Sequence, residues 1–302
     1  LKINKPNQLN SKAFIKLTKD KKSHTDYSLF KKMTAEKQEQ MLEKLQELKS
    51  YNDDEEPLRI ALMNTDIPVK YKSAAMRKIN TLEYMEEGTN EYYKLKQWVD
   101  TFMRIPFNKY ANLPITIDDG IDKCHEFMDS ANKTLNDAVF GLNDAKMQII
   151  QMVGQWITNP NAIGSAIAIK GPMGTGKTTL VKDGISKILG REFAFIALGG
   201  ATDSSVLEGH SYTYEGSTWG KIVDILVQCK SMNPVIYFDE LDKVSNTPKG
   251  EEIINLLIHL TDFSQNGHFM DKYYSDVPLD LSKALFIFSL NNLEKVNPIL
   301  RD

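Results

Sequence analysis

The chain has 302 residues, a length that favours two domains over a single core. Its 37 basic and 40 acidic side chains give a net charge of −3, so no overall positive field supports binding to nucleic acid. With 41% hydrophobic and 25% charged residues it has the composition of a soluble globular protein, and purely apolar runs such as 193–198 are far too short to cross a bilayer.

The first residues contain no apolar core and no initiator Met, so we expect no signal peptide and a chain that is a piece of a longer protein. The two cysteines, Cys124 and Cys229, provide neither a disulfide framework nor metal-ligand spacing. We expect both to be buried free thiols in a reducing compartment, the cytoplasm or an organelle matrix.

Residues 1–106 are expected to form a helical region that contacts substrate or a partner protein. From Ser28 the apolar residues recur at helical spacing. Five of them lie close to one face: Met33, Met41, Leu42, Leu45 and Leu48. Residues 58–85 continue the helical pattern, with an interruption at Pro68. A further helix is expected to start at a Thr89 cap and to end before the next proline.

Residues 107–302 are expected to form an α/β domain. Two helices are predicted in TIDDGIDKCHEFMDSANKTL and LNDAKMQIIQMVGQWI. From Ala166 short apolar runs alternate with helical segments, and the predicted strands are AIAIK, FAFIAL, PVIYFDE and ALFIFSL. Strands that are apolar on both faces indicate a parallel sheet covered by helices on both sides.

The strand AIAIK leads directly into GPMGTGKTTL, which has the pattern G-x-x-x-x-G-K-T. Its glycines let backbone N–H groups point inward at phosphate oxygens, and the following helix adds its positive end. Lys177 can contact the β- and γ-phosphates, and the Thr178 hydroxyl can bind Mg²⁺. An ordinary glycine-rich turn is the weaker alternative, because a strand precedes the motif and a helix follows it. We expect these residues to bind ATP: Gly171, Pro172, Gly174, Thr175, Gly176, Lys177, Thr178 and Thr179.

Polar residues end two later strands. Asp239 and Glu240 follow PVIYF, and open α/β sheets bind ligands at that edge. Asp239 would hold Mg²⁺ directly or through water, and Glu240 would act as general base on the attacking water. Asn291, after ALFIFSL, can hydrogen-bond that water or the γ-phosphate. A solvated acidic pair and a turn-forming Asn pair are the structural alternatives.

These motifs resemble, in this order, the AAA+ module of the Lon ATP-dependent proteases. The resemblance is carried by LGG, GH, TY-x-G, DE-x-DK and DLSK-x-LF, and extends upstream to WVDTFMRIPFNKY and AVFGLNDAKMQIIQMV. It implies a homohexameric ring with ATP and Mg²⁺ between subunits, an unfoldase and translocase acting on unfolded or tagged proteins. It also implies that Phe140 lies near the adenine. The arginine finger, helical lid and Ser–Lys peptidase domain would lie beyond Asp302.

The segment GHSYTYEGSTWG, residues 209–220, combines glycines and aromatics. The resemblance places Tyr214 as the aromatic residue of the loop that faces the central channel. Glu215 stands beside it, where the family has an aliphatic residue. The alternative is a hairpin whose tyrosines pack inward, which is stronger for Tyr212 than for Tyr214.

Three functions are compatible with the sequence. The first is an ATP-driven unfoldase that feeds an attached peptidase, and the second is a remodelling ATPase of Lon descent without a working peptidase. The third, a catalytically quiet nucleotide-binding scaffold, is disfavoured because Lys177, Thr178, Asp239 and Glu240 are all present. A membrane partner is not expected, and nothing in the charge supports a nucleic-acid partner.

Overall fold

The computed structural model describes residues 10, 13–14, 24–52, 57–160, 164 and 166–301. Cα packing divides the chain into two compact units, residues 1–64 and 65–302. The predicted division at residue 106, between a helical binding region and an ATPase domain, concerns function and stays a prediction. Cys124 and Cys229 are free thiols, but each is half-buried, so the prediction that they are buried is wrong. Among the described residues no helix is long and apolar enough to span a membrane.

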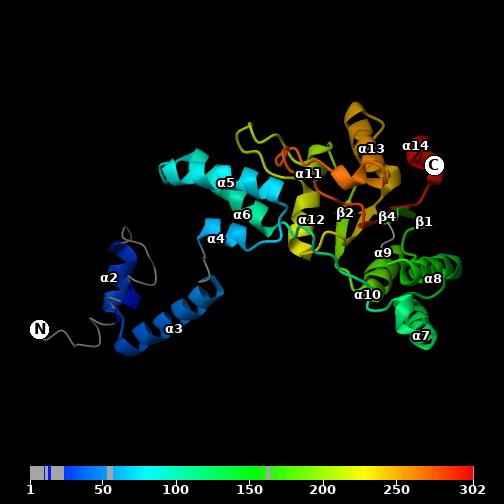
Figure 1. Ribbon diagram of the computed structural model, residues 1–302, viewed down its shortest axis with the longest axis horizontal. Coiled ribbons are helices and arrows are strands. Elements are labelled where there is room, and N and C mark those ends of the chain that lie inside the picture. The colour runs from blue at the N-terminus through cyan, green and yellow to red at the C-terminus, as the bar shows by residue number, and fades with distance from the viewer. Residues whose placement is uncertain are drawn as a thin grey trace, which may run out of the picture. The chain divides into compact units, whose positions relative to one another are not determined.

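Within its described residues the first unit contains three helices (Figure 1), α2 (His24–Lys32), α3 (Ala35–Asn52) and α4 (Leu58–Met63). The helical pattern that starts near Ser28 is split by a turn at Met33 and Thr34. The buried Gln38 amide stabilises this turn by donating a 2.9 Å hydrogen bond to the Phe30 carbonyl at the end of α2. Phe30 and Leu42 belong to the small apolar core of this unit.

The second unit begins with two packed helices, α5 (Val69–Tyr84) and α6 (Asn90–Arg104). Pro68 precedes α5, and the Thr89 hydroxyl accepts a hydrogen bond from the Tyr92 N–H at 3.2 Å, so the predicted cap of α6 is confirmed. The apolar face of α6 is buried at four positions: Leu95, Trp98, Val99 and Phe102.

A four-stranded parallel sheet forms the centre of the second unit, in the order β1-β4-β3-β2. All four predicted strands are present: β1 (Ala166–Lys170), β2 (Phe193–Ala197), β3 (Val235–Asp239) and β4 (Leu285–Leu290). The two central strands, β3 and β4, are buried over nearly their whole length, which explains their unbroken apolar sequences. The predicted α/β class is confirmed.

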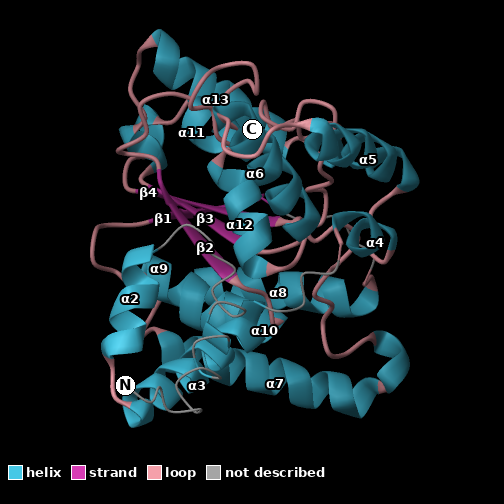
Figure 2. Cartoon of the chain, turned by 90° about the vertical axis from the view of Figure 1, so that its left-hand side faces the viewer, coloured by secondary structure: helices cyan, strands magenta, loops and turns pink. Residues whose placement is uncertain are grey.

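Helices cover both faces of this sheet (Figure 2). The helices between β1 and β2 cross the sheet in one direction. The helices between β2 and β3 and between β3 and β4 cross it in the opposite direction. Right-handed crossovers therefore place the two groups of helices on opposite faces. The first face also receives the two helices predicted upstream of β1, and its core includes Leu135, Val153, Ile185 and Ile287. On the other face Phe238 stacks on Phe288, with ring centroids 5.0 Å apart.

The remaining elements are as follows. On the first face lie α7 (Ile121–Ala138), α8 (Asn143–Thr158), α9 (Lys177–Thr179), the π-helical turn η2 (Leu180–Ile185) and α10 (Ser186–Leu189). After β2 come α11 (Ser205–Glu208), α12 (Lys221–Cys229), α13 (Pro248–Thr261) and α14 (Pro298–Arg301). Short 3-10 turns are η1 (Ile117–Asp119), η3 (Leu241–Lys243), η4 (Asn266–His268) and η5 (Leu293–Lys295).

Candidate functional site

Three loops meet at the carboxyl edge of the sheet. They follow β1, β3 and β4, whose ends lie side by side in the parallel sheet. Together they line a pocket of about 400 Å³. Its walls are Met173, Gly174, Thr175, Gly176, Lys177, Thr178, Thr179, Tyr237, Asp239, Glu240, Ser289 and Asn291. The structure thus brings together predicted site residues that are up to about 115 positions apart in the sequence.

The glycine-rich loop after β1 needs glycine at two of its turns. Gly174 has φ +76° and Gly176 has φ +85°, a backbone region that residues with a side chain rarely adopt. A Cβ atom on Gly176 would also lie 3.0 Å from the Val139 side chain, which packs against the loop. The loop therefore curls tightly before α9 begins at Lys177.

Lys177 ties this loop to the end of β4. Its Nζ donates to the carbonyls of Gly171 and Pro172 at 2.6 and 2.9 Å, and to Asn291 Oδ1 at 3.1 Å. A lysine ammonium has three donors, so two loop carbonyls and Asn291 take up all three. The Lys177 charge is therefore held at the floor of the pocket, next to Asn291.

A chain of hydroxyl groups connects Thr178 to Asp239. Thr178 Oγ1 donates to the Tyr237 hydroxyl at 3.2 Å, and that hydroxyl donates to Asp239 Oδ1 at 3.5 Å. Ser289 Oγ donates to the same carboxylate oxygen. Burial raises the pKa of Tyr237 above its ordinary value, so its hydroxyl keeps its proton at neutral pH.

Tyr237 and Ser289 were not predicted as site residues, because both lie inside runs of apolar residues. One signal could have found them. Each stands two positions before a predicted site residue, Asp239 or Asn291, and side chains two apart on a strand share a face.

Glu240 follows β3 in a left-handed conformation, with φ +58°, which is uncommon for a residue with a side chain. Its N–H donates to Ser289 Oγ at 3.2 Å. A Cβ atom on Gly199 would lie 2.4 Å from Glu240 Oε2, so the carboxylate rests directly on that glycine. Gly199 therefore leaves the space that the Glu240 side chain occupies.

The buried carboxylate of Asp242 fixes the loop after β4. It accepts hydrogen bonds from the backbone N–H groups of Asn291 and Asn292, each at 3.2 Å. The two asparagines then part: Asn291 turns its side chain to Lys177, while the Asn292 side chain accepts from the Glu294 N–H at 2.9 Å. Asn292 is thus the turn-forming residue, and Asn291 lines the pocket.

The segment 209–220 is a closed loop with turns and no strand. Its base is joined by a 3.0 Å hydrogen bond from the His210 N–H to the Thr218 carbonyl. Tyr212 packs inward, edge-on to Tyr273 at a centroid distance of 5.2 Å. Tyr214 is 67% exposed. The inward-packing alternative therefore describes the first tyrosine and not the second.

Two lysines from the preceding helices hold this loop. Lys78 of α5 and Lys94 of α6 lie over the ring of Tyr212, at 4.6 and 4.7 Å from its centroid. Lys94 Nζ also donates a 2.6 Å hydrogen bond to the Tyr214 carbonyl. The backbone of the exposed tyrosine is therefore fastened to α6, a contact that joins residues 120 positions apart.

Comparison with known proteins gives a consistent result. The family described as ATPase family associated with various cellular activities (AAA) matches residues 167–302. The chain is 39% identical over 256 residues to the Lon protease homolog of Acanthamoeba polyphaga mimivirus, which covers 80% of this chain and 25% of that protein. It is 34% identical over 281 residues to Lon protease 2 of Bdellovibrio bacteriovorus, covering 93% and 33%. For the mitochondrial Lon protease homolog of Homo sapiens the identity is 30% over 288 residues, covering 94% and 28%.

The chain carries a Lon-family AAA+ module. It spans about a quarter to a third of the length of these curated relatives. The family's ATPase chemistry implies a nucleotide with Mg²⁺.

The side chains that line this pocket suit Mg²⁺ and phosphate. Thr178 and Asp239 offer only oxygen atoms, the ligands that this hard cation prefers. Within the described residues no group of three or more His, Cys, Asp or Glu side chains could hold a metal ion. Mg²⁺ is usually held by one or two protein oxygens together with phosphate and water, and Thr178 and Asp239 can supply such oxygens.

Phe140 is not brought to this pocket. Its side chain is fully exposed and is not among the residues that line the cavity. Its neighbour Val139 contacts Gly176 instead. The contact between Phe140 and adenine, which the resemblance implied, stays a prediction.

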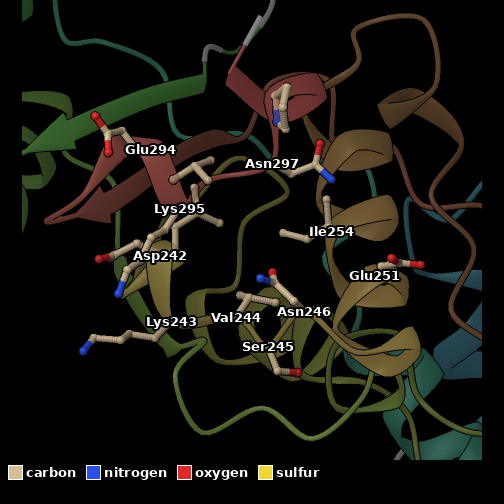
Figure 3. Close-up of a pocket in the computed structure, with 13 residues that line it drawn as sticks. Asp242, Lys243, Val244, Ser245, Asn246, Glu251, Ile254, Glu294, Lys295 and Asn297 are labelled. Atoms are coloured by element: carbon tan, nitrogen blue, oxygen red, sulfur yellow. The ribbon is translucent and has the colours of Figure 1, made fainter.

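A second, open pocket of about 700 Å³ lies between η3, α13 and η5 of the module (Figure 3). Asn297 and Ile254 point toward its middle, whereas the charged ends of Lys243 and Glu251 point away from it. Because the charged groups labelled there do not converge, this pocket presents no catalytic arrangement of the kind seen at the strand ends.

Asp271 anchors the end of the loop 209–220. Its fully buried carboxylate accepts hydrogen bonds from the N–H groups of Gly220 and Tyr273, each at 2.8 Å, and of Tyr274 at 3.3 Å. Burial raises the pKa of Asp271 to about 6, although these N–H groups act in the opposite direction. The Asp271 carboxyl therefore holds its proton more tightly in the folded state than in the unfolded state.

A pH-dependent stability follows for Asp271. The folded pKa of about 6 exceeds the ordinary 3.8, so the contribution of this carboxyl to stability is complete below 3.8 and lost as pH rises through 6. The variant Asp271→Asn does not undergo this loss. The free energy of unfolding of the variant minus that of the wild type should therefore increase by about 1.3 kcal/mol from pH 5 to pH 7. Urea unfolding at both pH values measures it, with the exposed Asp129→Asn as control. An unchanged difference would contradict the assignment.

Proposed function

We propose that this chain is the motor of an ATP-driven protein unfoldase and translocase within a Lon-like ATP-dependent serine protease. The observation that carries the proposal is the single pocket that unites Lys177, Thr178, Asp239, Glu240 and Asn291 in a module of this family. Six copies would form a ring with nucleotide at the subunit interfaces, and unfolded or tagged proteins would be the substrates. A reducing compartment suits the two free thiols.

Each pocket residue has a defined role in this proposal. The glycine-loop N–H groups and Lys177 bind the phosphates, and Thr178 and Asp239 hold Mg²⁺, which neutralises phosphate charge. Glu240 accepts a proton from the attacking water, and Asn291 orients that water or the γ-phosphate. The link from Lys177 to Asn291 supports a shared task, because one ligand can contact both.

The exposed Tyr214 supports a grip on the translocating polypeptide. An aromatic ring offers a large apolar surface with few rotatable bonds and needs no particular substrate sequence. Gly216, at φ +70°, allows the turn just after it, and Glu215 is also exposed at the tip. Since Lys94 binds the Tyr214 carbonyl and not its ring, the side chain stays accessible while its backbone is held.

Tyr214→Ala in the full-length ring should uncouple ATP hydrolysis from work on the substrate. We expect basal ATP hydrolysis within about twofold of wild type and ATP-dependent unfolding of a tagged fluorescent protein reduced by about tenfold, equivalent to about 1.4 kcal/mol. Tyr214→Phe should retain most unfolding, and Tyr84→Ala, another exposed tyrosine, serves as control.

The outcomes separate the candidate functions. Normal unfolding by Tyr214→Ala would place the grip on another residue. ATP-dependent unfolding by the wild-type ring without cleavage of peptide bonds would favour the alternative, a remodelling ATPase of Lon descent. The absence of ATP hydrolysis from the assembled ring would contradict both.

A further inference from the structure

We propose that Tyr237 is a positioning residue for the Mg²⁺ ion that accompanies the nucleotide, an inference that rests on the proposed function. Its hydroxyl stands between Thr178 Oγ1, at 3.2 Å, and Asp239 Oδ1, at 3.5 Å. These are the two side chains whose oxygen atoms would hold the ion. A single phenol thus connects the helix after the glycine loop with the end of β3.

The phenol is rigidly placed. Tyr237 is fully buried, and its ring packs against the rings of Phe193 and Phe195 on β2, at centroid distances of 5.9 and 6.0 Å. In the sheet Tyr237 pairs with Phe195 on one side and Ile287 on the other. A tyrosine ring has only two side-chain dihedrals, so this packing fixes the position of its hydroxyl.

The direction of the hydrogen bonds favours metal binding. A threonine hydroxyl has one donor and two acceptor lone pairs, and Thr178 gives its donor to Tyr237. Its lone pairs are therefore kept for a cation. The donors Tyr237 and Ser289 both end on Asp239 Oδ1, which leaves the lone pairs of Oδ2 for the ion or its water molecules.

Loss of the hydroxyl should weaken this arrangement without changing the fold. In Tyr237→Phe the ring and its packing stay, but Thr178 loses the acceptor that orients it and Asp239 loses one of two donors. Groups that orient metal ligands typically contribute about 10- to 100-fold to metal affinity. We therefore expect the Mg²⁺ concentration that gives half-maximal tightening of ADP binding to rise about tenfold, while ADP affinity in EDTA stays unchanged.

The test uses ADP and Mg²⁺ as probes, so no turnover is needed. A fluorescent ADP analogue is bound to the full-length protein in EDTA and then titrated with MgCl₂, with thermal unfolding as a check on the fold. Tyr273→Phe removes another buried tyrosine hydroxyl, outside the pocket, and should leave the Mg²⁺ requirement unchanged. Ser289→Ala, which removes the second donor to Asp239, should shift it in the same direction as Tyr237→Phe and provides the test if that variant does not fold.

The results distinguish this inference from the proposed function. An unchanged Mg²⁺ requirement in folded Tyr237→Phe would overturn the positioning role. If that variant does not fold, an unchanged requirement in Ser289→Ala would overturn it. A lower requirement in Tyr237→Phe would also overturn it, since the hydroxyl would then compete with the ion. Failure of the wild-type protein to bind ADP, with or without Mg²⁺, would instead contradict the nucleotide site itself.

Discussion

Lys177→Ala should lower the affinity for ATP by about 100-fold, because hydrogen bonds to charged groups contribute about 1.5–3 kcal/mol each and 1.4 kcal/mol corresponds to tenfold. The ammonium is held at the pocket floor by Gly171, Pro172 and Asn291, so a bound phosphate meets a charge that is already in place. The measurement is equilibrium binding of a fluorescent ATP analogue in the presence of Mg²⁺.

The matched control is Lys182→Ala, which removes the same charge from an exposed position in the adjoining turn η2, outside the pocket. It should bind ATP with wild-type affinity. Thermal unfolding of both variants tests the fold, since Lys177 also bonds two loop carbonyls. Wild-type ATP affinity in a folded Lys177→Ala protein would remove the glycine loop from the nucleotide site.

Much of the fold could be predicted from the sequence, because the pattern of apolar residues indicates which segments are buried. The strands β3 and β4 are apolar at almost every position since they are covered on both faces, and this pattern identifies them without a structure. The Thr89 cap and the helix boundary at Pro68 are equally local, because they depend on a few neighbouring residues. The turn at Thr34 was harder to predict, because the Gln38 bond that stabilises it reaches back eight residues to Phe30.

The candidate site also combines features that the sequence predicts with features that it does not. The glycine loop and the acidic strand end are short motifs whose chemistry is visible in the sequence. The contacts that hold the loop 209–220 are not visible there. Lys94 reaches the Tyr214 carbonyl from a helix far upstream, and Asp271 fastens Gly220 from a segment 51 residues later. Such contacts depend on how the elements pack, which periodicity does not specify.

The position of Glu240 supports a specific chemical role. It adopts a left-handed backbone conformation at the end of β3, anchored by its N–H bond to Ser289. Sparsely populated conformations of this kind cost about 1–3 kcal/mol and are found preferentially at functional sites. Its carboxylate rests against Gly199 and lines the same pocket as Lys177. These observations support a base held at the pocket wall.

Glu240→Gln should therefore separate binding from hydrolysis. The amide has nearly the same shape but cannot accept the proton of the attacking water, so we expect kcat for ATP hydrolysis to fall by about 10²–10⁴-fold. ATP affinity should stay within about threefold, since phosphate binding is assigned to the glycine loop and Lys177. Phosphate release by the full-length ring, compared with fluorescent ATP binding, measures both, and the exposed Glu252→Gln on α13 is the matched control. Unchanged turnover in Glu240→Gln would exclude it as the base. A parallel loss of ATP binding would show that its carboxylate acts in holding the nucleotide or its metal ion, because only a base confined to the chemical step leaves binding intact.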